Sequence, residues 1–324
     1  MTYLKQNQDN HAAAKLLAEI RLRKSCAIQL MHNPFDLNNT SGYLDWRKRK
    51  LAHAITSTGD LIVEIKNPRA LTPAEHEALL DRCRRSNMAV YASHAQDIDE
   101  NSVRQLGQQF GLNRLDANWL ASEQGITHIT VCADDERRQA FIPYTDRAIK
   151  WHTDGYYNAP EQQVRSLLLH CAQSAAKGGE NRLMDHEIAY LMLRDANIDF
   201  IRALSAQDAM TIPERIDEQD IARPAQTGPV FSIDPASGSL HMRYTARTRS
   251  IVWKQDATTL AAVTALEKLL ASDSPHIHHA RLESGMGLLS NNVLHDRAEF
   301  SDNPSHPRLL FRARYLDRIA GTNN

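Results

Sequence analysis

The spacing of hydrophobic residues separates a helix-rich first part of the chain from a strand-rich remainder. Hydrophobic positions recur at helical spacing and predict amphipathic helices over 9–32, 44–55 and 99–110. Another helix should begin at Thr72, because Pro73 and Glu75 follow it in the order of a capping box. Alternating or β-branched runs predict strands over 59–65, 88–92 and 126–131. Helices therefore alternate with single strands up to about residue 130.

Beyond Ile142 the pattern changes to short hydrophobic runs that are bounded by turn residues. Strands are expected over 164–171, 230–233, 240–244, 287–294 and 309–315, and helices over 185–205 and 256–272. Many short strands with flanking helices are typical of a double-stranded β-helix, or jelly roll, in a mainly β fold with some α. We expect an N-terminal helical extension over 1–58 and one jelly-roll domain over 59–324.

Composition narrows the classes of partner. The chain of 324 residues carries 38 Lys and Arg against 39 Asp and Glu, for a net charge of -1. No global field therefore attracts it to nucleic acid or to an anionic membrane, and a small-molecule substrate is expected. The sequence shows no signal-peptide pattern and no apolar run of spanning length, which predicts a cytoplasmic protein. The sequence is also compatible with a homo-oligomer.

The cysteines give no sign of a disulfide framework or of a thiolate zinc site. Cys26, Cys83, Cys132 and Cys171 are scattered and form no CxxC pair. We expect free thiols that pack as small hydrophobic side chains.

A more specific pattern is His152-Thr153-Asp154, followed much later by His295. Residues two apart on a β-strand project from the same face, whereas a helix would separate them by about 200°. His152 and Asp154 could thus chelate one ion, and His295 at the end of an apolar run could supply the third ligand. Two imidazoles and one carboxylate form the facial triad of non-haem Fe(II), which leaves three coordination positions open.

Two arginines after His295 extend this hypothesis. An Fe(II) centre that uses O₂ needs electrons, which 2-oxoglutarate can supply when it is decarboxylated to succinate. The distal carboxylate of 2-oxoglutarate suits a bidentate arginine, and Arg308 follows His295 by 13 residues. Arg312 lies four residues further on and should share its strand face, where it could hold an anionic substrate. Arg314 and Arg318 crowd this segment, so a structural salt bridge for Arg312 stays an alternative.

These motifs together resemble the taurine/2-oxoglutarate dioxygenase family, which is related to the clavaminate-synthase-like oxygenases. The resemblance covers about residues 60–315 and rests on four segments in order: Trp151 to Asp154, Lys177 to Asn181, Asp234 to Gly238, and His295 with Arg308 and Arg312. It implies an Fe(II) enzyme with 2-oxoglutarate and O₂ as co-substrates, metal ligands His152, Asp154 and His295, and Arg308 as the 2-oxoglutarate anchor.

The chain also departs from the family pattern. Asn181 replaces the threonine that helps to bind 2-oxoglutarate, and its amide can still donate a hydrogen bond. Residues 111–150 show no match to the side chains that bind taurine. The resemblance therefore implies hydroxylation of a small, acid-bearing substrate other than taurine, with release of succinate and CO₂.

Other functions remain open at this point. The same cofactor cycle can end in desaturation or cyclisation, while halogenation is disfavoured because the carboxylate ligand Asp154 is present. A non-catalytic jelly-roll binding module is an alternative from a different class, since fold does not fix function. His276, His278 and His279 form a second histidine-rich segment, but no carboxylate or cysteine lies at ligand spacing, so we expect no metal there.

Overall fold

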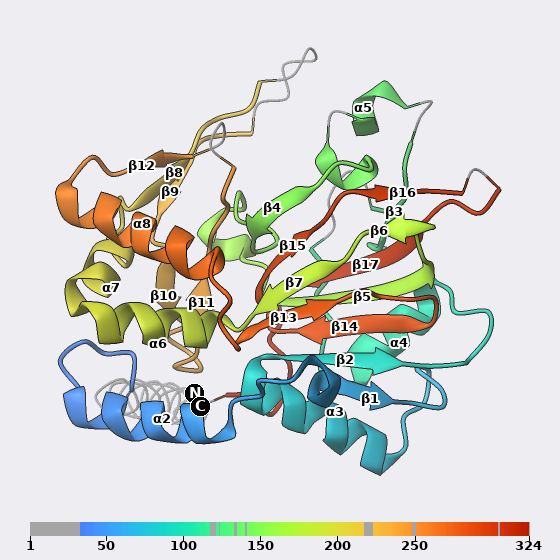
Figure 1. Ribbon diagram of the computed structural model, residues 1–324, viewed down its shortest axis with the longest axis horizontal. Coiled ribbons are helices and arrows are strands. Elements are labelled where there is room, and N and C mark those ends of the chain that lie inside the picture. The colour runs from blue at the N-terminus through green and yellow to red at the C-terminus, as the bar shows by residue number, and fades with distance from the viewer. Residues whose placement is uncertain are drawn as a thin grey trace, which may run out of the picture.

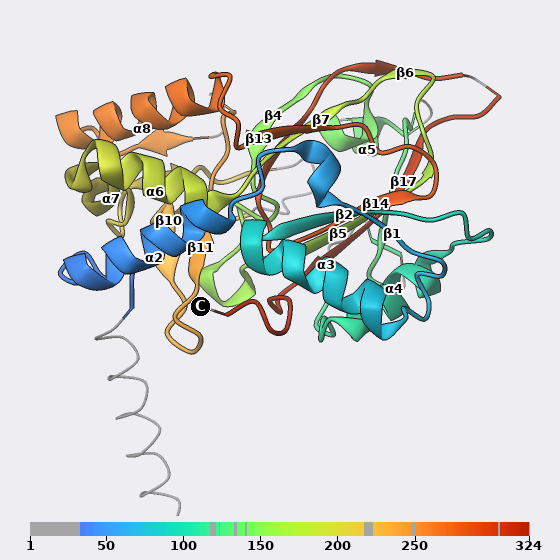
Figure 2. The ribbon, with the colours of Figure 1, turned by 60° about the horizontal axis from the view of Figure 1, so that its bottom comes forward.

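Two β-sheets face each other in this protein, with helices packed outside them (Figures 1 and 2). The computed structural model describes residues 33–323 apart from 117–120, 123, 133–134, 140, 217–222, 248–250 and 304. The helix expected over 9–32 lies outside the described residues. Among the described helices, none has the length and apolar character needed to span a bilayer.

The larger sheet has six strands in the order β1-β2-β14-β5-β17-β3. Their bounds are β1 Ile62–Glu64, β2 Met88–Ala92, β3 Thr127–Ile129, β5 Ser166–Gln173, β14 Met286–Ser290 and β17 Leu309–Tyr315. Helices α3 (Pro73–Ser86) and α4 (Glu100–Gln109) cover its outer face. The capping box predicted at Thr72 is confirmed: its side chain accepts from Glu75, whose carboxylate accepts from the Thr72 main chain.

The smaller sheet has four strands in the order β13-β7-β15-β4. Most of the candidate site residues described below lie on these strands or directly beside them. Their bounds are β4 Ile149–His152, β7 Asn181–Met184, β13 Ile277–Ala280 and β15 Leu294–Arg297. A short ribbon pairs β6 (Lys177–Gly178) with β16 (Phe300–Ser301) beside this sheet. Figure 2 shows the smaller sheet lying above the larger one.

The alternation of side chains along β5 explains how the two sheets pack. Leu167 and Leu169 point into the space between the sheets, where they meet Leu183 of β7. Leu168 points the other way and packs with the helices α3 and α4. Because successive strand residues face opposite sides, one continuous apolar strand can serve both cores.

A second group of elements packs beside the sheets and encloses its own core. It contains α2 Thr40–His53, α6 His186–Ala196, α7 Ile198–Leu204, α8 Ala257–Leu270, β8 Met210–Ile212, β9 Gln226–Gly228, β10 Phe231–Ile233, β11 Leu240–Met242 and β12 Val252–Trp253. Tyr43 and Trp46 of α2 pack against Tyr190 of α6. The expected division of the chain at residue 58 stays a prediction.

Short helices lie in the connections between these elements: η1 Thr58–Leu61, α5 Glu136–Gln139, η2 Ile142–Tyr144 and η3 Pro160–Gln162.

The predicted jelly-roll fold, mainly β with flanking helices, is confirmed, but two expected elements are divided. The helix expected over 185–205 is broken at Asn197, whose side chain caps α7 while its main-chain N–H closes α6. The strand expected over 287–294 is also two strands, β14 and β15, which belong to different sheets. Asn292 lies between them with φ of 53°, a left-handed conformation that ends the first strand. His295 therefore lies on the smaller sheet.

Candidate metal centre and co-substrate cavity

His152, Asp154 and His295 converge at one edge of the smaller sheet. β15 pairs antiparallel with β4, and the register places His295 directly opposite His152. The two imidazole centroids are 4.2 Å apart, and one ligand atom from each of the three residues lies within 4.8 Å of the others. Among the described residues this is the one group of three or more candidate metal-binding side chains.

Asp154 reaches this cluster by a different route from the one expected. The sequence pattern placed His152 and Asp154 on one strand face, but β4 ends at His152 and Asp154 lies in the turn that follows. The turn continues through Gly155 at φ of 68°, where an added Cβ would lie 2.4 Å from the Val164 side chain. The carboxylate still comes within 3.6 Å of His152 Nε2.

Both imidazoles are oriented by their own strands. His152 Nδ1 lies 2.9 Å from the Lys150 carbonyl oxygen, and His295 Nδ1 lies 2.9 Å from the Val293 carbonyl oxygen. A carbonyl can only accept, so each Nδ1 carries the proton and donates it. The nitrogen that can offer its lone pair to a metal is therefore Nε2 in both rings. Such a contact on the far nitrogen is how histidine ligands are held in the tautomer that binds metal.

The electrostatics of the cluster favour an ionised Asp154 carboxylate beside a neutral His295 imidazole. Burial alone would raise the pKa of Asp154, but the nearby Arg312 and the two histidines hold it well below its usual value. Burial lowers the pKa of His295 to about 4. Asp154 Oδ2 is buried without a hydrogen bond, and Arg312 approaches it at 3.5 Å. A carboxylate oxygen without a hydrogen bond and two converging Nε2 atoms fit the donor set of Fe(II).

A cavity between the two sheets connects this cluster with Arg308. From the larger sheet it is lined by apolar residues, Ile129, Leu167, Leu169 and Leu310, together with Arg308 and Arg312. The guanidinium of Arg308 is buried and lies over the Phe300 ring at 4.9 Å. It forms no hydrogen bond or ion pair with any residue that the structure describes. Burial lowers the pKa of Arg308, and Asp302 is close enough to oppose this shift but forms no ion pair with it, so the buried guanidinium can still bind an anion in this cavity.

Arg312 lines the same cavity, as expected for a residue that shares a strand face with Arg308. The two other arginines of this segment are already engaged. Arg314 pairs with Asp116 at 2.7 Å and donates to the Tyr157 hydroxyl, and Arg318 donates to the Asn87 side chain. Arg312 contacts only the candidate ligand Asp154 among the described acidic residues, at 3.5 Å, and its Nε is buried without a partner.

Asn181 also lines the cavity, but its amide is partly used by the fold. Its Nδ2 donates to the main-chain oxygen of Asp296 at 2.7 Å, while its Oδ1 is buried without a partner. One Nδ2 hydrogen remains for a ligand. Sequence reasoning did not identify Arg297, which also lines the cavity. Its guanidinium donates to the carbonyl oxygens of Pro143 and Thr145 and lies over the Phe300 ring, 4.8 Å from the centroid. Burial lowers the pKa of Arg297 to about 9.

Comparison with known proteins agrees with this geometry. A family model described as taurine catabolism dioxygenase TauD, TfdA family matches residues 49–314. The chain belongs to this family. The resemblance inferred from the sequence motifs is therefore confirmed, and the TauD/TfdA match includes all three residues of the candidate metal centre.

Two curated relatives are named uridine-5'-phosphate dioxygenase. The one from Amycolatopsis sp is 31% identical over 178 residues, which cover 53% of this chain and 62% of the relative. The one from Streptomyces sp is 27% identical over 187 residues and covers 52% and 62%. The chain thus matches less than two thirds of the length of these relatives.

Several solved structures share the fold of this TauD/TfdA-family chain. AAD-2 in complex with Mn(II) and N-oxalylglycine superposes with a TM-score of 0.57 at 13% identity, covering 81% of this chain and 97% of its own. Non-heme iron oxygenase OrfP in complex with Fe and alpha-ketoglutaric acid gives 0.55 at 17% identity, covering 76% and 80%. Asparagine oxygenase in complex with Fe(II), 3-hydroxyasparagine and succinate gives 0.54 at 14% identity, covering 77% and 85%.

Proposed function

We propose that this protein is an Fe(II)/2-oxoglutarate-dependent dioxygenase that hydroxylates a small, acid-bearing substrate and releases succinate and CO₂. The observation that carries the proposal is the convergence of His152, Asp154 and His295 beside the buried Arg308 in one cavity. Family membership agrees with it. A non-catalytic binding module would need neither three converging ligand side chains nor an unpaired cation next to them.

The metal would be held through His152 Nε2, His295 Nε2 and a carboxylate oxygen of Asp154. Both Nδ1 atoms are occupied by main-chain carbonyls, so each ring presents only its Nε2. Arg308 would bind the distal carboxylate of 2-oxoglutarate, and Asn181 would add one hydrogen bond from Nδ2. When bound, Fe(II) and 2-oxoglutarate supply O₂ activation, with 2-oxoglutarate as the source of two electrons.

The protein's own contribution is to orient the ligands and to keep this chemistry away from bulk water. Ile129, Leu167, Leu169 and Leu310 form the apolar wall of the cavity. Such a wall lowers the local dielectric and strengthens the ion pair that Arg308 makes with a carboxylate. Holding the substrate near the metal favours transfer of oxygen to the substrate over unproductive loss of 2-oxoglutarate.

Arg312 is the residue that we propose for binding the acid group of the substrate. It reaches Asp154 at 3.5 Å, so an anion held by its guanidinium would lie beside the metal. The two curated relatives are named for uridine-5'-phosphate, whose phosphate fits a guanidinium. Uridine-5'-phosphate is therefore the first substrate to test, and taurine is expected to fail. Desaturation or cyclisation by the same cycle remains the alternative outcome.

The remaining partner predictions are also part of this proposal. The balanced charge fits a small-molecule enzyme that works without nucleic acid or a membrane, and we propose a cytoplasmic location. A homo-oligomer remains compatible with the sequence, and light scattering on the purified protein would measure it.

An anaerobic titration tests the core of the proposal. Adding Fe(II) and 2-oxoglutarate to the metal-free protein should produce the visible charge-transfer band of the chelate, which a binding module would not show. Succinate release is then measured with uridine-5'-phosphate, uridine and taurine as separate additions. Release that depends on the phosphate compound but not on uridine supports an acid-bearing substrate. Absence of the band, or coupled sulfite release from taurine, contradicts the proposal.

A further inference from the structure

We infer that Asn292 is a positioning residue that holds the carboxylate ligand Asp154 through its main chain, an inference that rests on the metal site proposed above. Asn292 Oδ1 accepts the main-chain N–H of Asp154 at 2.8 Å. Its Nδ2 donates to the main-chain oxygen of the same residue at 2.9 Å. One side-chain amide thus pairs with both polar groups of a single residue, as a neighbouring strand would.

Asp154 needs this pairing because it lies outside any strand. β4 ends at His152, and the isolated bridge on its other side joins His152 to Thr245. Thr153 is held by Tyr244, which accepts from the Thr153 N–H and donates to its hydroxyl. Among the described residues, only Asn292 contacts the main-chain N–H and C=O of Asp154 through hydrogen bonds. Removing this amide would leave the ligand's main chain without a partner.

The position of Asn292 gives these bonds a functional consequence. It lies in the turn between β14 and β15, three residues before His295, with φ of 53°. Its Nδ2 also donates to the Val164 main-chain oxygen at 2.7 Å. The side chain therefore fixes the turn that carries Asp154 against the segment that carries His295. Ligands on separate segments keep a chelating geometry only if such contacts hold the segments together.

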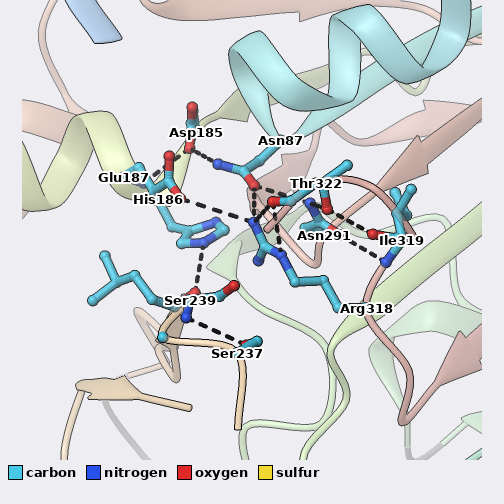
Figure 3. A network of polar contacts seen from close by, with 12 residues as sticks. Asn87, Asp185, His186, Glu187, Ser237, Ser239, Asn291, Arg318, Ile319 and Thr322 are labelled. Atoms are coloured by element: carbon cyan, nitrogen blue, oxygen red, sulfur yellow. Dashed lines mark hydrogen bonds and ion pairs between the residues drawn. The ribbon is translucent and has the colours of Figure 1, made fainter. Parts of the chain in front are cut away.

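The preceding residue, Asn291, provides a matched control. It has the same side chain, lies in the same turn and is equally buried, at 3% exposure against 2% for Asn292. Its Nδ2 donates to the Asn87 side chain at 2.9 Å and to the Thr322 hydroxyl at 3.0 Å (Figure 3). Its Oδ1 accepts from the Ile319 N–H. Asn291 thus joins the chain terminus to α3 and contacts no candidate metal ligand.

The test compares Asn292→Gly with Asn291→Ala in the full chain. Glycine tolerates the left-handed backbone at 292, so this variant removes the amide without adding strain. We expect the Kd for Mn(II), measured by titration below the melting temperature of both variants, to rise roughly 10- to 100-fold for Asn292→Gly. Asn291→Ala should stay within about threefold of the wild type, although both variants should melt earlier.

A second measurement uses the metal-free protein. The main-chain N–H of Asp154 should exchange with solvent deuterium faster in Asn292→Gly than in the wild type or in Asn291→Ala. A Kd within threefold of the wild type for Asn292→Gly, or an equal loss in both variants, overturns the positioning role. Failure of the metal site itself is distinguishable, because the wild type would then not bind Mn(II) or His295→Ala would bind it equally well.

Discussion

The smaller sheet carries two histidine-rich regions, and only one of them has the geometry of a metal centre. His152 on β4 and His295 on β15 face each other across a strand pair, with Asp154 beside them. His278 and His279 lie on β13, at the opposite edge of the same sheet. There, His278 is buried with its Nδ1 unpartnered while its neighbour His279 is exposed, because successive strand residues face opposite sides.

The comparison shows which properties distinguish a candidate metal ligand from a histidine that only packs in the core. Burial does not, because it lowers the pKa of both His278 and His295 to about 4. The difference lies in orientation and in the third donor. His295 has its Nδ1 on a main-chain carbonyl, which directs Nε2 toward His152 and a carboxylate. The density of histidines along the sequence is therefore a weaker indicator than the register that brings two strands together.

The largest effect is expected for the candidate ligand His295. His295→Ala should reduce bound Fe(II) from about one per chain to nearly none and abolish coupled turnover, because two remaining ligands do not form the facial triad. Iron is measured after anaerobic reconstitution and desalting, together with succinate release. Full iron content and activity in this variant would mean that the metal binds elsewhere, and the distinction between the two regions would be lost.

The next largest effect concerns Arg308, at the far end of the cavity. Arg308→Ala should raise the 2-oxoglutarate Kd by at least roughly two to three orders of magnitude, because losing one side of a buried charge pair costs about 3 kcal/mol or more. Arg308→Lys is the matched control, since it keeps the charge but loses the bidentate geometry. The charge-transfer band measures binding. If Arg312→Ala alone has this effect, the roles of the two arginines are exchanged.

A smaller effect is expected for Arg312. Arg312→Ala should raise the KM for an acid-bearing substrate by roughly 10- to 100-fold, because a charged hydrogen bond contributes about 1.5 to 3 kcal/mol. The charge-transfer band of Fe(II) and 2-oxoglutarate should keep its shape and amplitude. A variant that loses this band, or one that binds substrate normally, would place Arg312 among the structural ion pairs of its segment.

Much of this site was predictable because its elements depend on local patterns. The jelly roll followed from short alternating strands, and the candidate ligands from residue types in a fixed order. The position of Asp154 in a turn was not predictable from the sequence. Its main-chain N–H and C=O pair with the remote side chain of Asn292, and no local pattern shows that the strand ends before it. Asn292 lacks any local signal: its amide contacts residues 138 and 128 positions away. Long-range contacts of this kind are fixed by packing of whole strands.

The pH dependence of stability gives a smaller but quantitative test of the buried histidines. Burial lowers the pKa of His278 to about 4. As the pH falls below about 6.5, His278 is therefore protonated in the unfolded chain but stays neutral in the folded chain. This contribution to stability is present above that pH and is lost as pH falls toward 4. Between pH 7 and 5 the free energy of unfolding should fall by about 2 kcal/mol on account of this residue.

Urea denaturation at the two pH values measures this effect in the wild type and in His278→Gln. The decrease should be smaller by about 2 kcal/mol in the variant, whose amide does not titrate. An equal decrease in both proteins would mean that His278 is protonated in the folded state, and hence that this edge of the sheet is more open to solvent than the structure indicates.

The smallest effect on metal content is expected for the histidine-rich segment itself. Replacing His276, His278 and His279 together by Ala should lower the melting temperature, because His278 is buried and its removal leaves space in the core. Iron content should nevertheless stay near one per chain, since none of the three belongs to the converging group. Reconstitution well below the melting temperature separates the two effects, with Asp154→Ala as the control that should lose iron without changing β13. A fall to half of the wild-type iron or less in the triple variant would show that β13 contributes ligands after all, and that convergence across β4 and β15 is not what defines the site.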